Sequence, residues 1–419
     1  MIQTQHWFFW LFLSLYLLHL LVEFGLDALN LKHLEENRGR IPDLFLGVFS
    51  PDEYRRSIAY TRAKTHFSWA KTGFDALLLW TLILSGGFYR LDLWLGAWLP
   101  THSLWHQVAY PFTLGALFYA LHLPFSLYYQ FVLEEKFGFN RMGIKTFVGD
   151  QLKSLGLSLA LGIPLLALIF WLVPTIGPRW WLVAWGVLML FQLLTAALFP
   201  VLFAPLFYKF TKLSEGELKD RLQALAEKLR FRMAGVFTID GSRRSAHSNA
   251  FFAGIGKTRR IVLFDTLIQS LSTAEIVSVI AHEIGHNKKR HILKGLLLSS
   301  ATTLLSLWIL EKCLEWPPFF EAFGVPEPSL QVGFVIFALL SGVFTFPLNP
   351  IFQWLSRRNE YEADRYSVEV NGDRQAMVSS LVKLSKDNLS NLTPHPWYSF
   401  YHYSHPTTTE RAEAIAVLP

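Results

Sequence analysis

Long apolar stretches recur along this chain of 419 residues, and they constrain its fold more than any other feature of the sequence. A helix needs roughly 20 apolar residues to cross the hydrocarbon core of a bilayer, which is about 30 Å thick. By that criterion we count about seven such stretches. They run approximately over residues 7–22, 69–88, 108–132, 155–173, 181–203, 293–310 and 332–351. The sequence therefore predicts a mainly α-helical, polytopic membrane protein.

The composition agrees with a membrane environment and limits the kind of metal site. Hydrophobic residues make up 52% of the chain and charged residues only 17%, whereas soluble domains contain about 25% charged residues. The formal net charge is +6, but the basic residues lie between the apolar stretches, so we expect topology signals and no nucleic-acid partner. Cys313 is the only cysteine, which excludes an intrachain disulfide and a cysteine-rich zinc site. Any metal must be held by histidine and carboxylate side chains.

Loops rich in lysine and arginine alternate along the chain with loops that contain few of these residues. By the positive-inside rule this pattern places the N-terminus outside and the rich loops, with the C-terminal segment, in the cytoplasm. The first apolar stretch is expected to remain as an anchor, because residues 1–6 contain no basic residue of the kind that a signal peptide carries. We expect a membrane region over residues 1–207 with five spans, a protease segment over 208–292, two further spans over 293–355 and a second protease segment over 356–419.

The first of the two polar segments has the pattern of a small α+β domain. Residues 218–229 are expected to form a helix, and residues 236–239, 250–253 and 260–264 to form short strands. The last two strands would be joined as a hairpin through the glycine-containing residues 254–257. Although two spans separate the polar segments in sequence, they should meet on one membrane face and form one catalytic domain.

A metal-binding pattern follows this predicted hairpin. Ser272 and Glu275 are spaced as a helix capping box, and apolar residues continue from there with helical periodicity. The sequence His282-Glu283-Ile284-Gly285-His286 therefore lies within a helix, with both histidines on one face. Two imidazoles at this spacing can bind one zinc ion, and the intervening glutamate can act as general base. Chance occurrence on an exposed helix is the simpler alternative for so short a motif.

A catalytic zinc usually has three protein ligands, so a third is expected elsewhere. Glu360, Glu362 and Asp364 follow the last apolar stretch, and helical spacing puts Glu360 and Asp364 on one face. Glu360 is the candidate ligand, and Asp364 would then orient a ligand histidine by a hydrogen bond. Periodicity alone does not choose between Glu360 and Glu362, and each carboxylate also fits a solvated surface. His291 is expected to mark the helix end at the membrane surface and not to add a ligand.

Several further motifs, in the same order along the chain, resemble the type I CAAX prenyl protease family of membrane zinc proteases. The resemblance covers nearly the whole length and rests on residues 123–129 and 134–140, on Ser245-Ala-His-Ser-Asn-Ala250, on residues 260–266, on Ser356-Arg-Arg with Glu360 and Asp364, and on Asn391-Leu-Thr-Pro-His-Pro396 and Tyr403-Ser-His-Pro406 with Arg411. It implies seven spans around a large chamber, a gluzincin-like zinc domain, and polar span residues such as Asp75, His122 and Gln192 lining a wet interior.

The same resemblance assigns roles to individual residues. It implies one zinc ion per chain held by His282, His286 and Glu360, with Glu283 as catalytic general base. It also implies that Asn249, Ala250 and Phe251 contact an extended substrate, and that His405 and Arg411 lie near the metal. A hairpin edge can bind a peptide by strand addition. From the residues alone, His405 could donate to the oxyanion or be structural, and Arg411 could simply buttress Asp364.

Two departures from the family pattern affect what is expected of this chain. Pro406-Thr407 stands where the family often has two prolines, which should change loop stiffness more than chemistry. The chain ends without a dibasic retrieval signal, so we expect a bacterial inner membrane, or the endoplasmic reticulum if the source is eukaryotic. We also expect a monomer with membrane lipid around it.

The sequence thus predicts a zinc endopeptidase acting on membrane-associated, possibly prenylated CAAX-type peptide or protein substrates. The nearest alternative is an HtpX-like quality-control protease, which shares the metal-binding helix but has fewer spans. A transporter or channel with structural zinc is the alternative from another class. It would require four closed protein ligands, whereas this sequence offers three.

Overall fold

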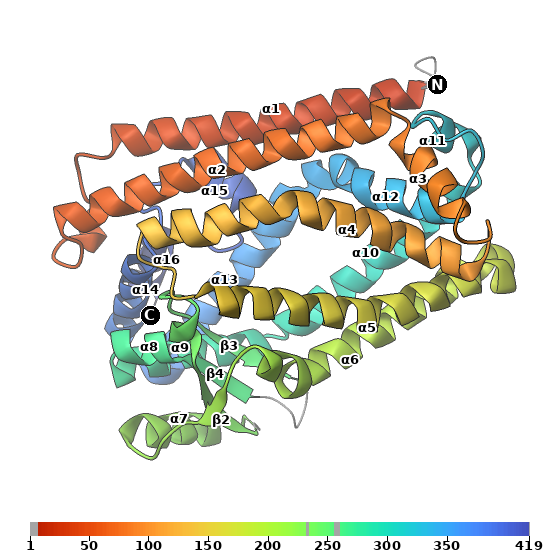
Figure 1. The fold of residues 1–419 in the computed structure, drawn as a ribbon. Coiled ribbons are helices and arrows are strands. Elements are labelled where there is room, and N and C mark those ends of the chain that lie inside the picture. The colour runs from red at the N-terminus through yellow and green to blue at the C-terminus, as the bar shows by residue number, and fades with distance from the viewer. Residues whose placement is uncertain (1–6, 232–233, 255–259, 419) are drawn as a thin grey trace.

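Helices build most of the molecule (Figure 1). The computed structural model describes residues 7–231, 234–254 and 260–418. The helices that contain the apolar stretches are α1 (Trp7–Glu36), α2 (Pro51–Leu84), α3 (Gly87–Gly96), α4 (Leu104–Tyr128), α5 (Ile144–Ile176), α6 (Trp180–Leu198), α10 (His291–Leu314), α12 (Leu330–Thr345) and α13 (Asn349–Asn371). Several of them, such as α1, α2 and α5, are longer than the predicted apolar stretches. The mainly helical, membrane-spanning architecture is as predicted.

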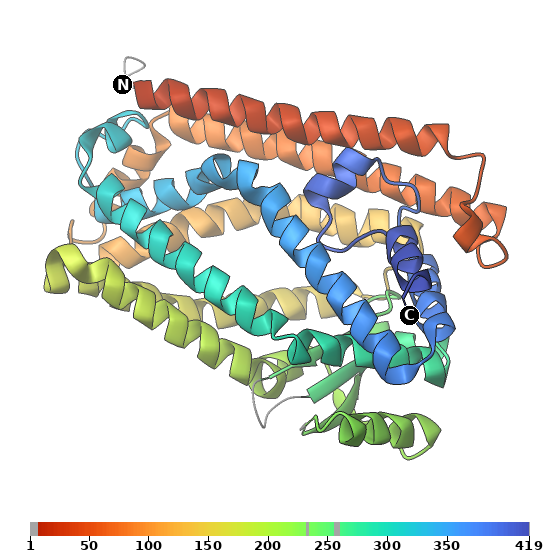
Figure 2. The same cartoon turned by 180° about the vertical axis from the view of Figure 1, so that it is seen from behind.

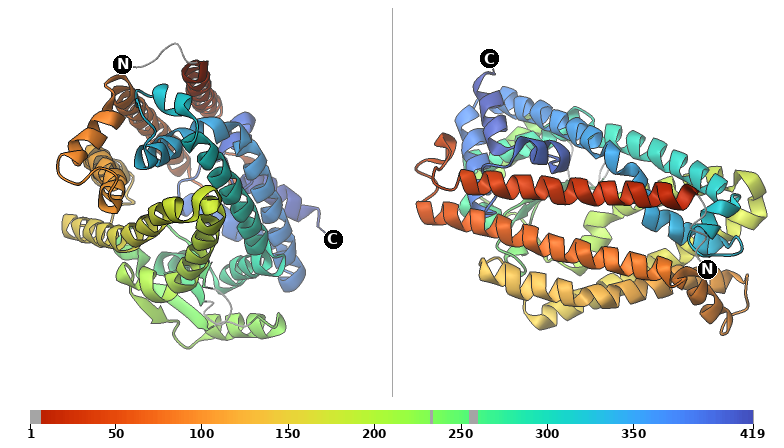
Figure 3. Two further views of the ribbon diagram at one scale, coloured as in Figure 1. Left: turned by 90° about the vertical axis from the view of Figure 1, so that its right-hand side faces the viewer. Right: turned by 90° about the horizontal axis from the view of Figure 1, so that it is seen from above.

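Among the described residues, five helices or runs of consecutive helices are long and apolar enough to cross a membrane, and α2 with α3 make a sixth if that bent pair is one span. One of the five covers residues 144–206 and so includes both α5 and α6, which pack against each other. The total of seven spans stays a prediction. Seen end-on, the helices surround the middle of the molecule (Figure 3).

Two predicted spans are interrupted by a turn between separate helices. The stretch over residues 69–88 breaks where α2 ends, because Gly86 adopts a left-handed φ of 66°, and α3 continues at an angle of 65°. The stretch over residues 332–351 breaks at a 3₁₀ turn, Phe346–Leu348, between α12 and α13. Pro347 and Pro350 lie at this break, and each lacks the N–H that a continuous helix needs. A hydropathy profile averages over many consecutive residues, so it could not show either break.

A four-stranded sheet lies at one end of the bundle, opposite the start of α1 (Figures 1 and 2). Its strands are β1 (Phe210–Lys212), β2 (Gly235–Ile239), β3 (Ala250–Ala253) and β4 (Arg260–Phe264), in the order β1-β2-β4-β3. The strands predicted over residues 250–253 and 260–264 are confirmed and pair antiparallel, with Ala250 opposite Leu263. Most of their predicted connection, residues 255–259, lies outside the described residues. β2 pairs parallel with β4, so β3 is left at an edge.

Further helices belong to the two polar segments. They are α7 (Glu217–Lys228), α8 (Asp265–Ser270), α9 (Thr273–Lys288), α14 (Arg374–Asp387), α15 (Pro396–His402) and α16 (Thr408–Ala416). Leu222 of α7, Leu263 of β4 and Ile280 of α9 are among the buried residues of their shared hydrophobic core. Because α9 also packs against α13 and α14, the structure brings the two polar segments together, as the sequence led us to expect.

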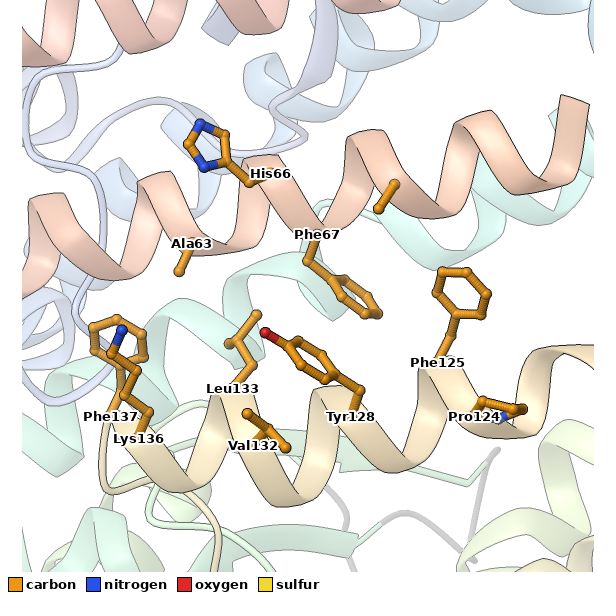
Figure 4. A pocket seen from close by; sticks show the side chains of 11 residues that line it. Ala63, His66, Phe67, Pro124, Phe125, Tyr128, Val132, Leu133, Lys136 and Phe137 are labelled. Carbon is orange, nitrogen blue, oxygen red and sulfur yellow. The ribbon is translucent and has the colours of Figure 1, made fainter.

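An apolar pocket of about 530 Å³ lies between α2 and α4 (Figure 4). The Phe67 and Tyr128 rings face each other across it and stack at a centroid distance of 5.9 Å. No residue predicted for the catalytic site lines this pocket. The predicted catalytic residues therefore lie outside this pocket.

Candidate active site

The helix that carries the two histidines begins as its sequence predicts. The Ser272 side chain accepts a hydrogen bond from the Glu275 amide, and the Glu275 carboxylate accepts one from the Ser272 amide at 2.7 Å. Ile276, Ile280 and Ile284 are almost fully buried. Burial of this apolar face fixes the rotation of α9, and His282 and His286 then project from one face, one turn apart.

Glycine within the motif lets α13 approach α9 closely. A Cβ atom placed on Gly285 would lie 3.2 Å from the Ala363 Cα atom, which is tighter than most Cβ contacts in proteins. The Ser367 hydroxyl also donates to the Ser278 carbonyl at 2.7 Å, which ties the two helices together one turn further along. This close packing brings Glu360 to the histidines.

Three donor groups converge where α9 meets α13. The His282 Nε2 atom lies 3.1 Å from His286 Nε2 and 3.4 Å from Glu360 Oε2, and His286 Nε2 lies 3.3 Å from Glu360 Oε1. Tetrahedral zinc with bonds of about 2.0 Å requires ligand atoms about 3.3 Å apart. Glu360 is only 4% exposed, and its Oε2 atom is buried without a hydrogen-bond partner among the described residues. A buried acceptor in this state is expected where a cation binds.

Asp364 and Arg411 support the first histidine. The His282 Nδ1 atom lies 2.7 Å from Asp364 Oδ1, and Arg411 donates two hydrogen bonds to the same carboxylate, at 2.6 and 2.8 Å. Burial alone would lower the pKa of His282, but the hydrogen bond to Asp364 and the neighbouring Glu360 carboxylate raise it to about 9. The pocket therefore favours positive charge. When Nδ1 donates its proton in a hydrogen bond to Asp364, the lone pair of Nε2 is left to bind a metal.

A second supporting chain, which sequence reasoning missed, ends at the other histidine. The His286 Nδ1 atom lies 3.0 Å from His291 Nδ1, and His291 Nε2 lies 3.1 Å from Glu362 Oε2. If His291 donates from Nε2 to Glu362, its Nδ1 accepts from His286, and the His286 Nε2 atom is again left free. His291 and Glu362 are not part of the group of three donors. Their role depends on contacts between α10 and α13, which helical spacing within one segment does not reveal.

We predict that replacing His291 with leucine weakens metal binding by about 10–100-fold, because residues that orient ligand histidines have effects of this size. His291→Asn keeps an acceptor near the original Nδ1 position and should recover part of the loss. Equilibrium metal titration of both variants checks this. Equal affinity in wild-type protein and His291→Leu would show that the contact is only structural.

Glu283 and His405 lie beside the three donors. Burial raises the pKa of Glu283, although the neighbouring histidines oppose that shift. The His405 Nε2 atom lies 3.4 Å from Glu360 Oε1, and its side chain is 62% exposed. The exposed ring opens into a polar cavity of about 710 Å³ that reaches from α15 to α2. A substrate in this cavity can therefore meet His405, whereas Glu283 is not among the residues that line it.

The predicted substrate residues lie at the start of the edge strand. Asn249 accepts a hydrogen bond from the Phe264 amide at 3.1 Å through its main-chain carbonyl, and its side-chain oxygen accepts from the Ala250 amide at 2.8 Å. Ala250 and Phe251 follow on β3, which pairs with β4 on one side only and packs against α9. The hairpin edge is thus held next to the helix that carries the histidines.

Of the polar span residues, Asp75 and His122 contact each other between α2 and α4, and Lys71 pairs with Asp75 at 2.7 Å. The Gln192 amide nitrogen lies 3.5 Å from the Ser299 hydroxyl, between α6 and α10. These side chains are thus paired across neighbouring helices. A common wet chamber stays a prediction.

Comparisons with known proteins agree over almost the whole chain. Residues 30–209 match the family described as CAAX prenyl protease N-terminal, five membrane helices, and residues 212–418 match peptidase family M48. A CAAX prenyl protease 1 homolog from Oryza sativa subsp. japonica is 36% identical over 392 residues, covering 90% of both chains. CAAX prenyl protease 1 from Saccharomyces cerevisiae is 35% identical, covering 90% of this chain and 88% of the relative. The crystal structure of S. mikatae Ste24p superimposes with a TM-score of 0.90 at 32% identity, covering 96% of this chain and 97% of that one.

Proposed function

Because this chain belongs to the CAAX prenyl protease 1 family within peptidase family M48, and is an integral-membrane metalloprotease, we propose that it cleaves membrane-associated peptides with a prenylated CAAX-type terminus. One zinc ion, held by His282, His286 and Glu360, would serve the reaction. The observation that carries this proposal is the convergence of His282 Nε2, His286 Nε2 and the Glu360 carboxylate, whose closest contacts are 3.1 to 3.4 Å. The transporter alternative does not account for the peptidase match.

The residues present fit a zinc ion by their chemistry as well as by their spacing. Two neutral imidazoles and one carboxylate are a common zinc set that leaves a position open for water. Asp364 and Glu360 carry two negative charges in a buried region where Arg411 supplies one positive charge. When bound, zinc lowers the pKa of water to about 7 and polarises the scissile carbonyl.

The protein groups then perform the proton transfers and hold the substrate. Glu283 takes a proton from the attacking water and later gives it to the leaving amine, a role for which burial has raised its pKa. The Ser404 hydroxyl lies 2.9 Å from His405 Nδ1. If Ser404 donates there, His405 keeps its proton on Nε2 and can donate it to the oxyanion that forms on the carbonyl. Asp364 and Arg411 keep His282 in position.

We propose that the substrate backbone adds to β3 as a further strand. Main-chain hydrogen bonds of this kind depend little on side chains, so they suit substrates of differing sequence. Asn249, Ala250 and Phe251 would contact it. The catalytic domain would face the cytoplasm, with the start of α1 on the other side, and the protein would act as a monomer in a bacterial inner membrane.

Purified protein is expected to hydrolyse a farnesylated CAAX peptide and to cleave the same peptide without its farnesyl group more slowly. The reason is that an isoprenoid chain anchors the substrate in the membrane region next to the site. Rates and product masses for both peptides, with a misfolded membrane protein as a third substrate, provide the test. Preferential digestion of the misfolded protein would instead support the HtpX-like alternative.

A further inference from the structure

A basic pocket of about 490 Å³ lies where the helix bundle joins the sheet domain. Its lining includes five cationic side chains and one carboxylate, which are Lys145, Lys153, Lys209, Arg243, Arg244 and Asp150. They come from the start of α5, from the segment after α6 and from the turn Gly241–Arg243 with the residue that follows it. Three separate parts of the chain thus contribute positive charge to one concavity, which we call the basic pocket.

Arg244 forms the rigid base of the basic pocket. Only 8% of this residue is exposed, and its guanidinium donates to both Asp150 oxygens, at 2.8 and 3.0 Å, while it lies over the Tyr208 ring. Its Nη1 atom is buried without a hydrogen-bond partner among the described residues. Buried donors in native proteins are nearly always paired. Arg244 therefore keeps one unused donor beside a pocket that already has an excess of positive charge.

The remaining cations are exposed, and Asp150 cannot neutralise them all. The Lys153 ammonium lies 3.6 Å from Asp150 and donates to the Leu206 carbonyl at 2.8 Å. Three of these cations are exposed, and none of the three forms an ion pair with a described residue. They are Lys145, Lys209 and Arg243. Like charges gathered in one concavity produce a positive potential there, which favours the binding of an anion.

The position of the basic pocket identifies a source for that anion. α5 and α6 lie in the apolar candidate run over residues 144–206. The start of α5 and the end of α6 lie on the sheet side of the bundle (Figure 1), and residues from the start of α5 and from the segment after α6 line the basic pocket. Basic pockets at the ends of membrane helices are suited to anionic lipid head groups. We propose that the basic pocket binds a phosphate group, supplied by an anionic phospholipid of the surrounding leaflet.

A bound phosphate would also hold in place the segment that leads into β3, the strand proposed to bind the substrate. The Arg244 carbonyl accepts a hydrogen bond from the Arg141 amide at 3.2 Å, and the chain continues from Arg244 through Asn249 into β3. A phosphate that bridges Arg243 to Lys145 would therefore hold this segment against α5. The proposal concerns binding and holds whether or not the chain cleaves prenylated peptides.

The test uses the full-length protein in detergent, titrated with phosphatidylglycerol or with phosphatidylcholine of the same acyl chains and examined by native mass spectrometry. The pocket variant carries Lys145→Gln, Lys209→Gln and Arg243→Gln. The control carries Lys212→Gln, Arg221→Gln and Arg374→Gln, which are exposed cations outside the pocket lining. We expect phosphatidylglycerol to bind at least tenfold more weakly to the pocket variant than to wild type, with no change in the control.

Unfolding midpoints of both variants should match wild type, since all six positions are exposed. Equal lipid binding by wild type and the pocket variant, or equal weakening in both variants, would overturn the site. Inorganic phosphate and glycerol 3-phosphate form the second arm. Failure of either to displace the lipid at millimolar concentration supports the phospholipid source, whereas full displacement would assign the pocket to a soluble phosphate instead.

Discussion

Replacing Glu283 with glutamine is expected to reduce the rate of peptide hydrolysis by about 10²–10⁴-fold, because a positioned general base contributes a factor of this size. Glutamine has nearly the same shape but cannot take a proton from water. Since Glu283 is not one of the three converging donors, the variant should still bind one metal ion. Single-turnover rates with a farnesylated CAAX peptide, together with metal content, provide the measurement.

Glu369→Gln is a matched control for this experiment. Glu369 is an exposed carboxylate on α13, the helix that carries Glu360, and its replacement removes the same charge at a distance from the donors. The control should keep the wild-type rate. Undiminished turnover in Glu283→Gln with metal bound would reject the role of Glu283, whereas loss of metal would show that it helps to hold the site together.

Replacing Arg411 with methionine is expected to destabilise the folded protein by about 3–5 kcal/mol, the usual cost of removing one partner from a buried ion pair. Arg411 is 9% exposed, and its loss leaves Asp364, only 2% exposed, without its cation. Burial would lower the pKa of Arg411, but Asp364 raises it, so the guanidinium stays charged. Chemical unfolding in one detergent, with chelator present throughout, measures the difference.

The double variant Arg411→Met with Asp364→Leu tests the mechanism behind that loss. Removing both charges should recover much of the stability, because replacing a buried ion pair with apolar groups is often neutral. It should not recover activity, since His282 then lacks its orienting carboxylate. Arg365→Met, an exposed neighbour on α13, should have little effect. Wild-type stability in Arg411→Met would contradict the account of this pair.

The sequence predicts those features that depend on local pattern. Lipid requires long apolar helices, and the capping box at Ser272 specifies where α9 begins. Helical spacing likewise places His282 with His286 and Glu360 with Asp364. Contacts between distant segments are different. The parallel pairing of β2 with β4 and the chain from His286 through His291 to Glu362 depend on packing of several elements, which no single segment encodes.

Hydropathy also does not predict where the membrane helices begin and end. α2 begins at Pro51, well before the predicted apolar stretch, because Ser50 and Glu53 form a capping box and the first turns are polar. α1 likewise continues to Glu36 after its apolar part has ended. A hydropathy profile does not detect the polar residues that extend a membrane helix into water. The sequence therefore predicts where the membrane is crossed better than where each helix stops.

The central claim is that one zinc ion held by His282, His286 and Glu360 makes this membrane protein a protease. The most direct test is to measure zinc content and hydrolysis of a farnesylated CAAX peptide on the same preparation, before chelation, after chelation and after zinc is restored. We predict about one zinc per chain, loss of zinc and activity together, and recovery of both. Full turnover by a preparation from which all zinc has been removed would contradict the claim.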